Sequence, residues 1–230
     1  MSTTNMAMKS ANTMCAIVPV RAGSKRVPDK NIRPFASKSL LQIKIEQLKE
    51  AFDVQDIIVS TDCGVSAKIA SDLGAIVIWR PSDLASDTIS MSEVYKYLAE
   101  SVRYEHILFT HVTNPLCEGI EYKTARYLYE NMTLGHDSIT TISYLKDFIY
   151  TPEGKPLNFD PLNKPRSQDL PKYFKLNHAI SVLPRDLMIS QKNIVGKNPF
   201  FLEISDIAAT DIDTFLDFQV AEYIYKTLHP

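Results

Sequence analysis

Short apolar segments alternate with helix-like segments along most of the chain, and this alternation constrains the fold more than any other feature. Apolar segments occupy residues 15–20, 56–60, 75–79, 106–110 and 137–142, and helical patterns occupy residues 40–48, 65–73, 90–103 and 122–131. The apolar segments show little polar–apolar alternation, which is typical of parallel strands buried on both faces. The pattern therefore predicts an α/β fold in which a mostly parallel sheet lies between layers of helices.

The alternation of strands and helices is interrupted at residues 143–175 and then resumes. Five prolines between residues 143 and 175 exclude a continuous helix there. We predict a small excursion lobe at about residues 143–177, which holds the second substrate or a subunit contact. Apolar segments return at 179–183 and 200–204, and a helical stripe spans 214–228. Residues 15–230 are expected to form a single domain, preceded by a loosely ordered leader over residues 1–14.

Composition narrows the functional class. The chain of 230 residues has a net charge of −2, so we expect no nucleic-acid partner and no broad basic surface. The three cysteines form no C-x-x-C pair, which argues against a disulfide framework or a zinc site and favours the cytoplasm. The first residues are polar and resemble neither a secretion signal nor a membrane span, so no membrane association is expected.

A basic loop follows the first predicted strand. Arg21, Lys25, Arg26 and Lys30 surround a single glycine, Gly23. In α/β proteins a loop between a strand and a helix commonly holds an anionic ligand, and one glycine leaves most of that task to the cationic side chains. The loop therefore favours a triphosphate ligand, and the alternative is a solvated basic turn.

An acidic pair precedes the last predicted helix. Asp211 and Asp213 are two residues apart and would face the same way in an extended segment, with Ile212 turned into the core. Magnesium prefers one or two carboxylates together with substrate phosphates. The pair is therefore a candidate Mg²⁺ site, and the alternative is helix capping by Asp213 or Thr214.

Polar residues follow several other predicted strands, at the sheet edge where ligands bind. Asp62 could bind a ribose or cap a helix, and Arg80 with the hydroxyl-rich loop after it could bind a pyrimidine. For that loop the alternative is a turn with a helix cap at Ser90 or Ser92. His111 and His178 could each be a base, a substrate contact or a structural histidine. No residue pattern indicates covalent catalysis.

In order and spacing, these motifs resemble the cytidylyltransferases that activate 3-deoxy-2-ulosonic acids, especially the acylneuraminate (CMP-sialic acid) cytidylyltransferases. The resemblance runs from Ala16 to about Glu222. It rests on these stretches: Arg21-Ala22-Gly23-Ser24-Lys25 with Lys30-Asn31, Val59-Ser60-Thr61-Asp62, Arg80-Pro81 with Ala85-Ser86-Asp87-Thr88, Thr113-Asn114-Pro115, Asn177, and Asp211-Ile212-Asp213-Thr214 with Asp217.

The resemblance implies a Rossmann-like three-layer α/β/α nucleotidyltransferase fold and a homodimer. It also implies transfer of CMP from CTP to the anomeric hydroxyl of a sialic-acid-like acidic keto-sugar, with Mg²⁺ as cofactor and pyrophosphate as the second product, for surface glycan synthesis. By this resemblance the catalytic residues are Arg21, Lys30 and Asp211, and the metal ligands are Asp211 and Asp213. The nucleotide-binding residues are Arg21, Ser24, Lys25, Asn31, Arg80 and Ser90, and the sugar-binding residues are His111, Thr113, Arg166, Lys175 and Asn177.

The departures from the family pattern fall in the expected sugar pocket. His111 stands where the family has a glutamine, His178 follows Asn177 where the family has a glycine, and Lys175 replaces an arginine. Two alternatives therefore stay open. The chain could transfer a nucleotidyl group to a sugar phosphate or a phosphorylated alcohol, or it could be a nucleotide-binding homologue without activity.

Overall fold

A seven-stranded sheet forms the centre of the protein. We describe residues 13–86, 88–132 and 135–230 of a computed structural model, and the sheet order within them is β5-β4-β1-β6-β8-β7-β9. The strands are β1 (Met14–Val20), β4 (Ile57–Thr61), β5 (Ile76–Trp79), β6 (His106–Phe109), β7 (Ser138–Leu145), β8 (Tyr173–Pro184) and β9 (Pro199–Glu203). Neighbouring strands are parallel except β8, which runs antiparallel to β6 and β7. The predicted, mostly parallel sheet is confirmed.

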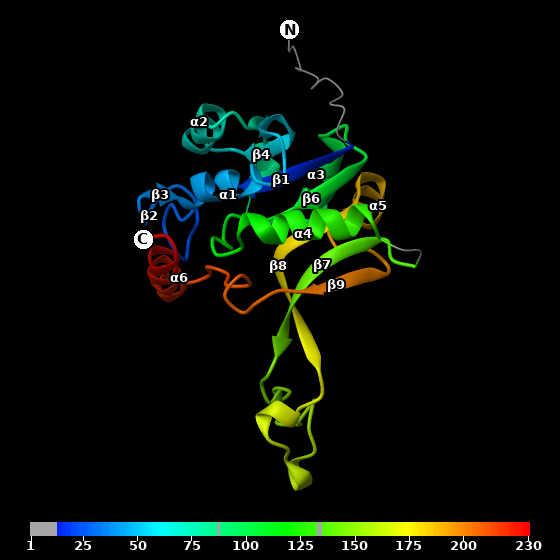
Figure 1. The fold of residues 1–230 in the computed structure, drawn as a ribbon. Helices are drawn as coiled ribbons and strands as arrows, with labels where there is room; N and C mark the ends of the chain where they lie inside the picture. The colour runs from blue at the N-terminus through cyan, green and yellow to red at the C-terminus, as the bar shows by residue number, and fades with distance from the viewer. Residues whose placement is uncertain (1–12, 87, 133–134) are drawn as a thin grey trace.

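Helices cover both faces of this sheet (Figure 1). They are α1 (Leu40–Leu48), α2 (Gly64–Asp72), α3 (Met91–Glu100), α4 (Gly119–Glu130), α5 (Arg185–Gln191) and α6 (Phe215–Leu228). A short hairpin of β2 (Pro34–Phe35) and β3 (Lys38–Ser39) precedes α1. Ser39 caps α1 by accepting a hydrogen bond from the Gln42 amide.

The two layers of helices enclose separate cores. Alternate residues of β1 point to opposite faces, so Ala16 and Val18 pack in one core and Cys15 and Ile17 in the other. The first core contains apolar side chains of α1, α2, α4 and α6, and the second contains those of α3 and α5. This arrangement confirms the predicted three-layer α/β/α fold.

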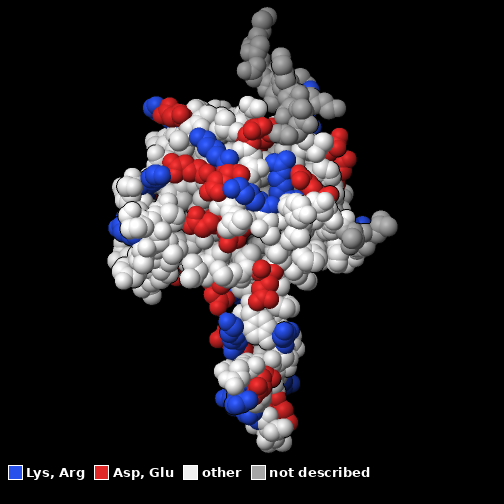
Figure 2. Space-filling model, in the orientation of Figure 1, with Lys and Arg blue, Asp and Glu red and all other residues white. Residues whose placement is uncertain are grey.

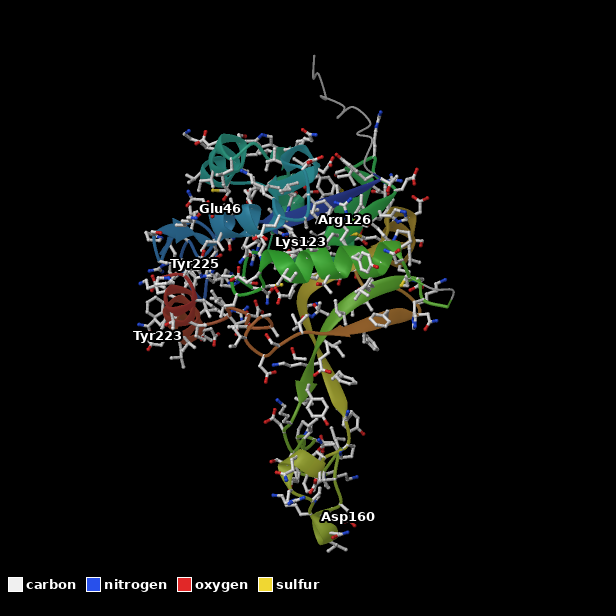
Figure 3. The ribbon with its side chains drawn as sticks, viewed as in Figure 1. Glu46, Lys123, Arg126, Asp160, Tyr223 and Tyr225 are labelled. Carbon is white, nitrogen blue, oxygen red and sulfur yellow. The ribbon has the colours of Figure 1, made fainter. Side chains whose placement is uncertain are left out.

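The segment between β7 and β8 projects away from the sheet, as Figure 1 shows. We call residues 143–176 the arm. At its base Ser143, Tyr144 and Leu145 pair with Lys175, Phe174 and Tyr173, and 3-10 turns occupy Pro161–Asn163 and Ser167–Asp169. Asp160 lies near its far end (Figure 3).

Several element boundaries differ from the prediction. Strand β8 begins at Tyr173, whereas the prediction began it at residue 179. The prediction missed the first residues because they are exposed and lack the apolar pattern of a buried strand. Helix α5 was not predicted, since seven residues following a strand directly give no clear helical period. Strand β1 begins at Met14, inside the predicted leader, while residues 1–12 of that leader lie outside the described residues.

Charges of both signs are mixed on the face that α1 and α4 form (Figure 2). Lys123 pairs with Glu50 at 2.9 Å and Arg126 pairs with Glu130 at 2.8 Å, and both cationic side chains are labelled in Figure 3. This face therefore presents alternating charge rather than a basic patch. Within the described residues we find no helix of the length and apolar character that a membrane crossing requires.

Candidate active site

A cleft of about 410 Å³ opens beside the carboxyl ends of β1, β5 and β6. Residues after all three strands line it, which is the expected location of a ligand site in such a sheet. The lining residues are Pro19, Arg21, Ser24, Lys25, Arg26, Val27, Lys30, Asn31, Arg80, Met91, His111, Val112 and Thr113. The cleft thus brings together six of the predicted nucleotide-site residues, namely Arg21, Ser24, Lys25, Lys30, Asn31 and Arg80.

Hydrogen bonds fix the basic loop to the sheet. The Ala22 amide donates to the Asp62 carboxylate at 2.8 Å, so Asp62 holds the loop and does not cap α2. The Asn31 side-chain amide donates to the Arg21 carbonyl at 3.2 Å, and the Asn31 carbonyl accepts from the Leu41 amide at 3.1 Å. Asn31 therefore lines the cleft while it also closes the loop onto the start of α1.

Two cations of the loop reach the acidic segment, although Lys30 and Ile212 are 182 residues apart in the chain. The Lys30 ammonium donates to the Ile212 carbonyl, and Arg26 forms an ion pair with Asp213 at 2.7 Å. Burial lowers the pKa of Lys30, and the carboxylates of Asp211 and Asp213 act in the opposite direction. The basic loop and the acidic pair therefore lie next to each other.

The acidic segment is anchored by its middle residue and by Thr113. Ile212 is fully buried, and its amide donates to the Thr113 carbonyl at 2.9 Å. Asp211 keeps surface in solvent, and partial burial raises its pKa by desolvation; the Thr113 side chain opposes this shift and Asp213 adds to it.

Helix capping is carried out by other residues. The Asp217 amide donates to the Thr214 hydroxyl at 3.2 Å, and Asp217 accepts from the Thr214 amide in return. This capping box at the start of α6 leaves Asp211 and Asp213 out of the cap. The predicted alternative of a helix cap at Thr214 is therefore present. This cap does not explain the positions of Asp211 and Asp213.

Arg80 forms a buried wall of the cleft. Its guanidinium donates to the Ser60 carbonyl at 3.1 Å, while its buried Nε has no hydrogen-bond partner within the described residues. Desolvation lowers the pKa of Arg80, and the nearby Asp62 opposes that shift. A buried donor left open at a cleft can be satisfied by a polar ligand.

Ser90, which the sequence predicted as a nucleotide-binding residue, caps helix α3. Its hydroxyl accepts from the Glu93 amide at 3.4 Å and caps α3. The next residue, Met91, lines the cleft in its place. The structure therefore supports the helix-cap alternative for Ser90 and gives the loop an apolar contact that the sequence did not indicate.

His111 lines the cleft, and His178 lies near it on β8. His111 packs edge-on against Phe109 at 5.0 Å and lines the cleft. Burial lowers the pKa of His111 to about 4, with His178 as the next contribution, so His111 is neutral near pH 7. His178 adopts a left-handed backbone with φ of 56° in β8, where the register with β7 shifts.

The predicted sugar-binding residues do not all converge. Thr113 lines the cleft, but Asn177 is buried and fixes the irregular part of β8. Its carbonyl oxygen accepts from the Thr141 hydroxyl at 2.6 Å, and its amide donates to the Ser143 hydroxyl at 2.9 Å. Arg166 and Lys175 are exposed on the arm, where Arg166 pairs with Asp169 at 2.7 Å. The cleft of this chain therefore lacks both arm residues.

The donor set at the acidic pair suits a magnesium ion held partly by a substrate. Asp211 and Asp213 supply two carboxylates next to the cationic loop, and phosphate oxygens and water would complete an octahedral shell. In the described ranges no cluster of three or more His, Cys, Asp or Glu side chains suits a metal. The described residues thus offer two carboxylates and no larger ligand cluster at this place, and Mg²⁺ binding stays a prediction.

Comparison with known proteins agrees with this geometry. The sequence profile of the cytidylyltransferase family matches residues 15–223. The chain belongs to the cytidylyltransferase family and is a nucleotidyltransferase.

Named relatives cover nearly the whole chain. It is 28% identical to the "Post-translational flagellin modification protein B" of Campylobacter coli, over 93% of this chain and 94% of that one. It is also 28% identical to the "CMP-N,N'-diacetyllegionaminic acid synthase" of Legionella pneumophila, over 92% of this chain and 95% of that one. A solved CMP:2-keto-3-deoxy-manno-octonic acid synthetase complexed with CTP shares the fold, with a TM-score of 0.68, 14% identity, and coverage of 94% and 99%.

Proposed function

We propose that the protein transfers CMP from CTP to the anomeric hydroxyl of a sialic-acid-like 3-deoxy-2-ulosonic acid and releases pyrophosphate. The observation that carries this proposal is the convergence of the basic loop and the acidic pair, which meet through Lys30 and through Arg26 and Asp213. The relative named for CMP-N,N'-diacetyllegionaminic acid synthesis supports an acid sugar of this class as the acceptor.

In the proposed reaction the acceptor hydroxyl attacks the α-phosphorus in line, and the bond to the pyrophosphate oxygen breaks. Arg21, Lys25 and Lys30 bind and orient the phosphates, because cationic side chains stabilise the charge that develops in phosphoryl transfer. Arg80 and the loop around Met91 hold the cytosine. Asp211 and Asp213 would hold Mg²⁺, which when bound supplies charge neutralisation at the phosphates.

The arm supports a homodimer. Its side chains include several exposed apolar groups, with Leu162 96% exposed and Tyr150 and Leu157 each more than half exposed. Exposed apolar groups in such number mark interaction surfaces. Arg166 and Lys175 lie on this arm, so in our proposal they reach the sugar site of a second copy. The three cysteines are free thiols, which suits the cytoplasm, where activated sugars for surface glycans such as capsule or lipopolysaccharide would be made.

The test is pyrophosphate release from CTP and Mg²⁺ with a panel of acceptors. The panel contains N,N'-diacetyllegionaminic, pseudaminic and N-acetylneuraminic acids and 2-keto-3-deoxy-manno-octonic acid. We expect one of the nine-carbon acids to be preferred. No release with any of them, together with tight CTP binding by calorimetry, would contradict the proposal and favour an inactive nucleotide-binding homologue. A diphosphate-linked product detected by ³¹P NMR with a phosphorylated acceptor would favour the other alternative.

A further inference from the structure

Lys44 is a fully buried lysine that contacts the loop after β6. It lies on α1, with no solvent exposure, and its ammonium donates to the Asn114 carbonyl at 2.9 Å and to the Tyr122 hydroxyl. The Tyr122 ring lies 4.8 Å from the ammonium. Desolvation lowers the pKa of Lys44 to about 8. Burying an ammonium is costly, and an apolar side chain of similar size would avoid that cost.

The partners of Lys44 do not require it for their own hydrogen bonding. The Asn114 carbonyl also accepts from the Cys117 amide at 3.3 Å, and the Tyr122 hydroxyl also bonds to the Thr110 hydroxyl at 3.1 Å. Removal of the ammonium would thus leave neither oxygen without a partner. A role for the buried lysine is instead indicated by the other contacts of Asn114.

Asn114 joins the loop after β6 to the acidic segment. Its side-chain amide donates to the Thr210 carbonyl at 3.2 Å, and the neighbouring Thr113 carbonyl accepts from the Ile212 amide at 2.9 Å. On the same face of α1, Gln47 donates to the Pro115 carbonyl at 2.7 Å. A continuous set of hydrogen bonds thus runs from the inside of α1, through residues 113–115, to residues 210–212.

We propose that Lys44 is a positioning residue, which holds Asn114 and thereby sets the position of the segment that carries Asp211 and Asp213. Its consequence for metal binding rests on the proposed function. Lysine suits the task because its long stem spans from the helix to the loop and its three donors can serve both oxygens at once.

Amide hydrogen exchange of the full-length chain tests the proposal without any substrate. In the Lys44→Met variant we expect the Ile212 amide to exchange roughly tenfold faster, while amides in β1 keep their protection. The matched control is Tyr122→Phe, which removes the other partner of Lys44 and leaves the Asn114 contact in place, so exchange at Ile212 should stay within about twofold. Unchanged exchange at Ile212 in Lys44→Met would overturn the proposal.

A second variant and a second measurement complete the test. Lys44→Gln keeps a polar group but shortens its reach, and it should behave like Lys44→Met. Failure of both variants to fold would overturn the proposal, because Lys44 would then serve the core itself. With Mn²⁺ and a non-hydrolysable CTP analogue, electron paramagnetic resonance should show roughly tenfold weaker Mn²⁺ binding in Lys44→Met. Lack of CTP turnover in the unaltered protein would count against the proposed function and would leave the exchange result intact.

Discussion

Arg26 and Asp213 form an ion pair of 2.7 Å that joins the basic loop to the acidic segment. Both side chains are more than half exposed, so the pair contributes little to stability and can open at small cost. A nucleotide with its metal offers each side chain a partner of the opposite charge. In the proposed reaction the pair would therefore open when CTP and its metal bind, since each side chain would gain a new partner.

Asp211→Asn should reduce metal-dependent turnover by about 100-fold or more, because it removes a carboxylate from the proposed cation site. Thermal unfolding should change little, since Asp211 takes no part in capping α6. The control is Thr214→Ala, which should cost about 1 kcal/mol of stability through loss of the cap and leave turnover nearly unchanged. Normal kinetics in Asp211→Asn would exclude the pair from the reaction.

Lys30→Met should lower kcat by about 100-fold or more, because the ammonium lies between the loop and the acidic segment, where charge develops at the phosphates. Steady-state kinetics with saturating CTP measure this effect. Lys38→Met is the matched control, since Lys38 lies on the exposed hairpin and pairs with Glu46. A kcat within twofold of the original for Lys30→Met would be the contrary result.

Arg80→Lys should raise KM for CTP by about tenfold, because an ammonium cannot reproduce the planar set of donors that includes the open Nε. Comparison with UTP in the same assay separates base recognition from phosphate binding. If Arg80 reads the cytosine, the ratio of kcat/KM for CTP to that for UTP should fall as well. Equal loss with both nucleotides would place Arg80 at the phosphates instead.

His111→Gln should make stability less sensitive to acid. Burial lowers the pKa of His111 to about 4, so between pH 6.5 and 4 the unfolded chain binds more protons than the folded one. Stability of the original protein should therefore fall as pH drops through this window. The original protein should therefore lose about 2 kcal/mol more free energy of unfolding over this window than the variant, a value that allows for the surface His111 keeps in the cleft. Denaturant unfolding at pH 7 and pH 4.5 measures it, and parallel curves would refute it.

Phe174→Asp should weaken the proposed dimer, because it places a charge among the exposed apolar side chains of the arm. Sedimentation velocity should show roughly tenfold weaker association. Leu216→Asp is the control, as Leu216 on α6 is 67% exposed and lies off the arm. If Leu216→Asp dissociates the protein and Phe174→Asp does not, α6 rather than the arm is the interface.

The sequence predicted the central sheet well because β1, β4 and β6 are short apolar segments whose burial on both faces leaves a clear pattern. It predicted the basic loop and the acidic pair because charges at strand ends are conspicuous. It gave no sign that Arg26 would meet Asp213, since that contact depends on how distant segments pack.

Other parts of the site carried weaker signals. Lys44 and Gln47 share a helix face with the buried Leu40 and Leu48, and polar residues on such an apolar face are the one signal that marked them. Met91 gave no signal, because an apolar residue at the start of a helix resembles any core residue. The sequence predicted an excursion without a continuous helix here, and gave no sign that the exposed residues 173–176 pair with β7 in a ladder.

Strand β8 runs without a break from the interior of the sheet into the arm. Its one irregular point is the step in register at Asn177 and His178, and irregularities of this kind bend a strand. The direction in which the arm leaves the body therefore depends on this step, where His178 has a φ of 56°. In an assembly built on the arms, this step would affect the angle at which one subunit faces the next.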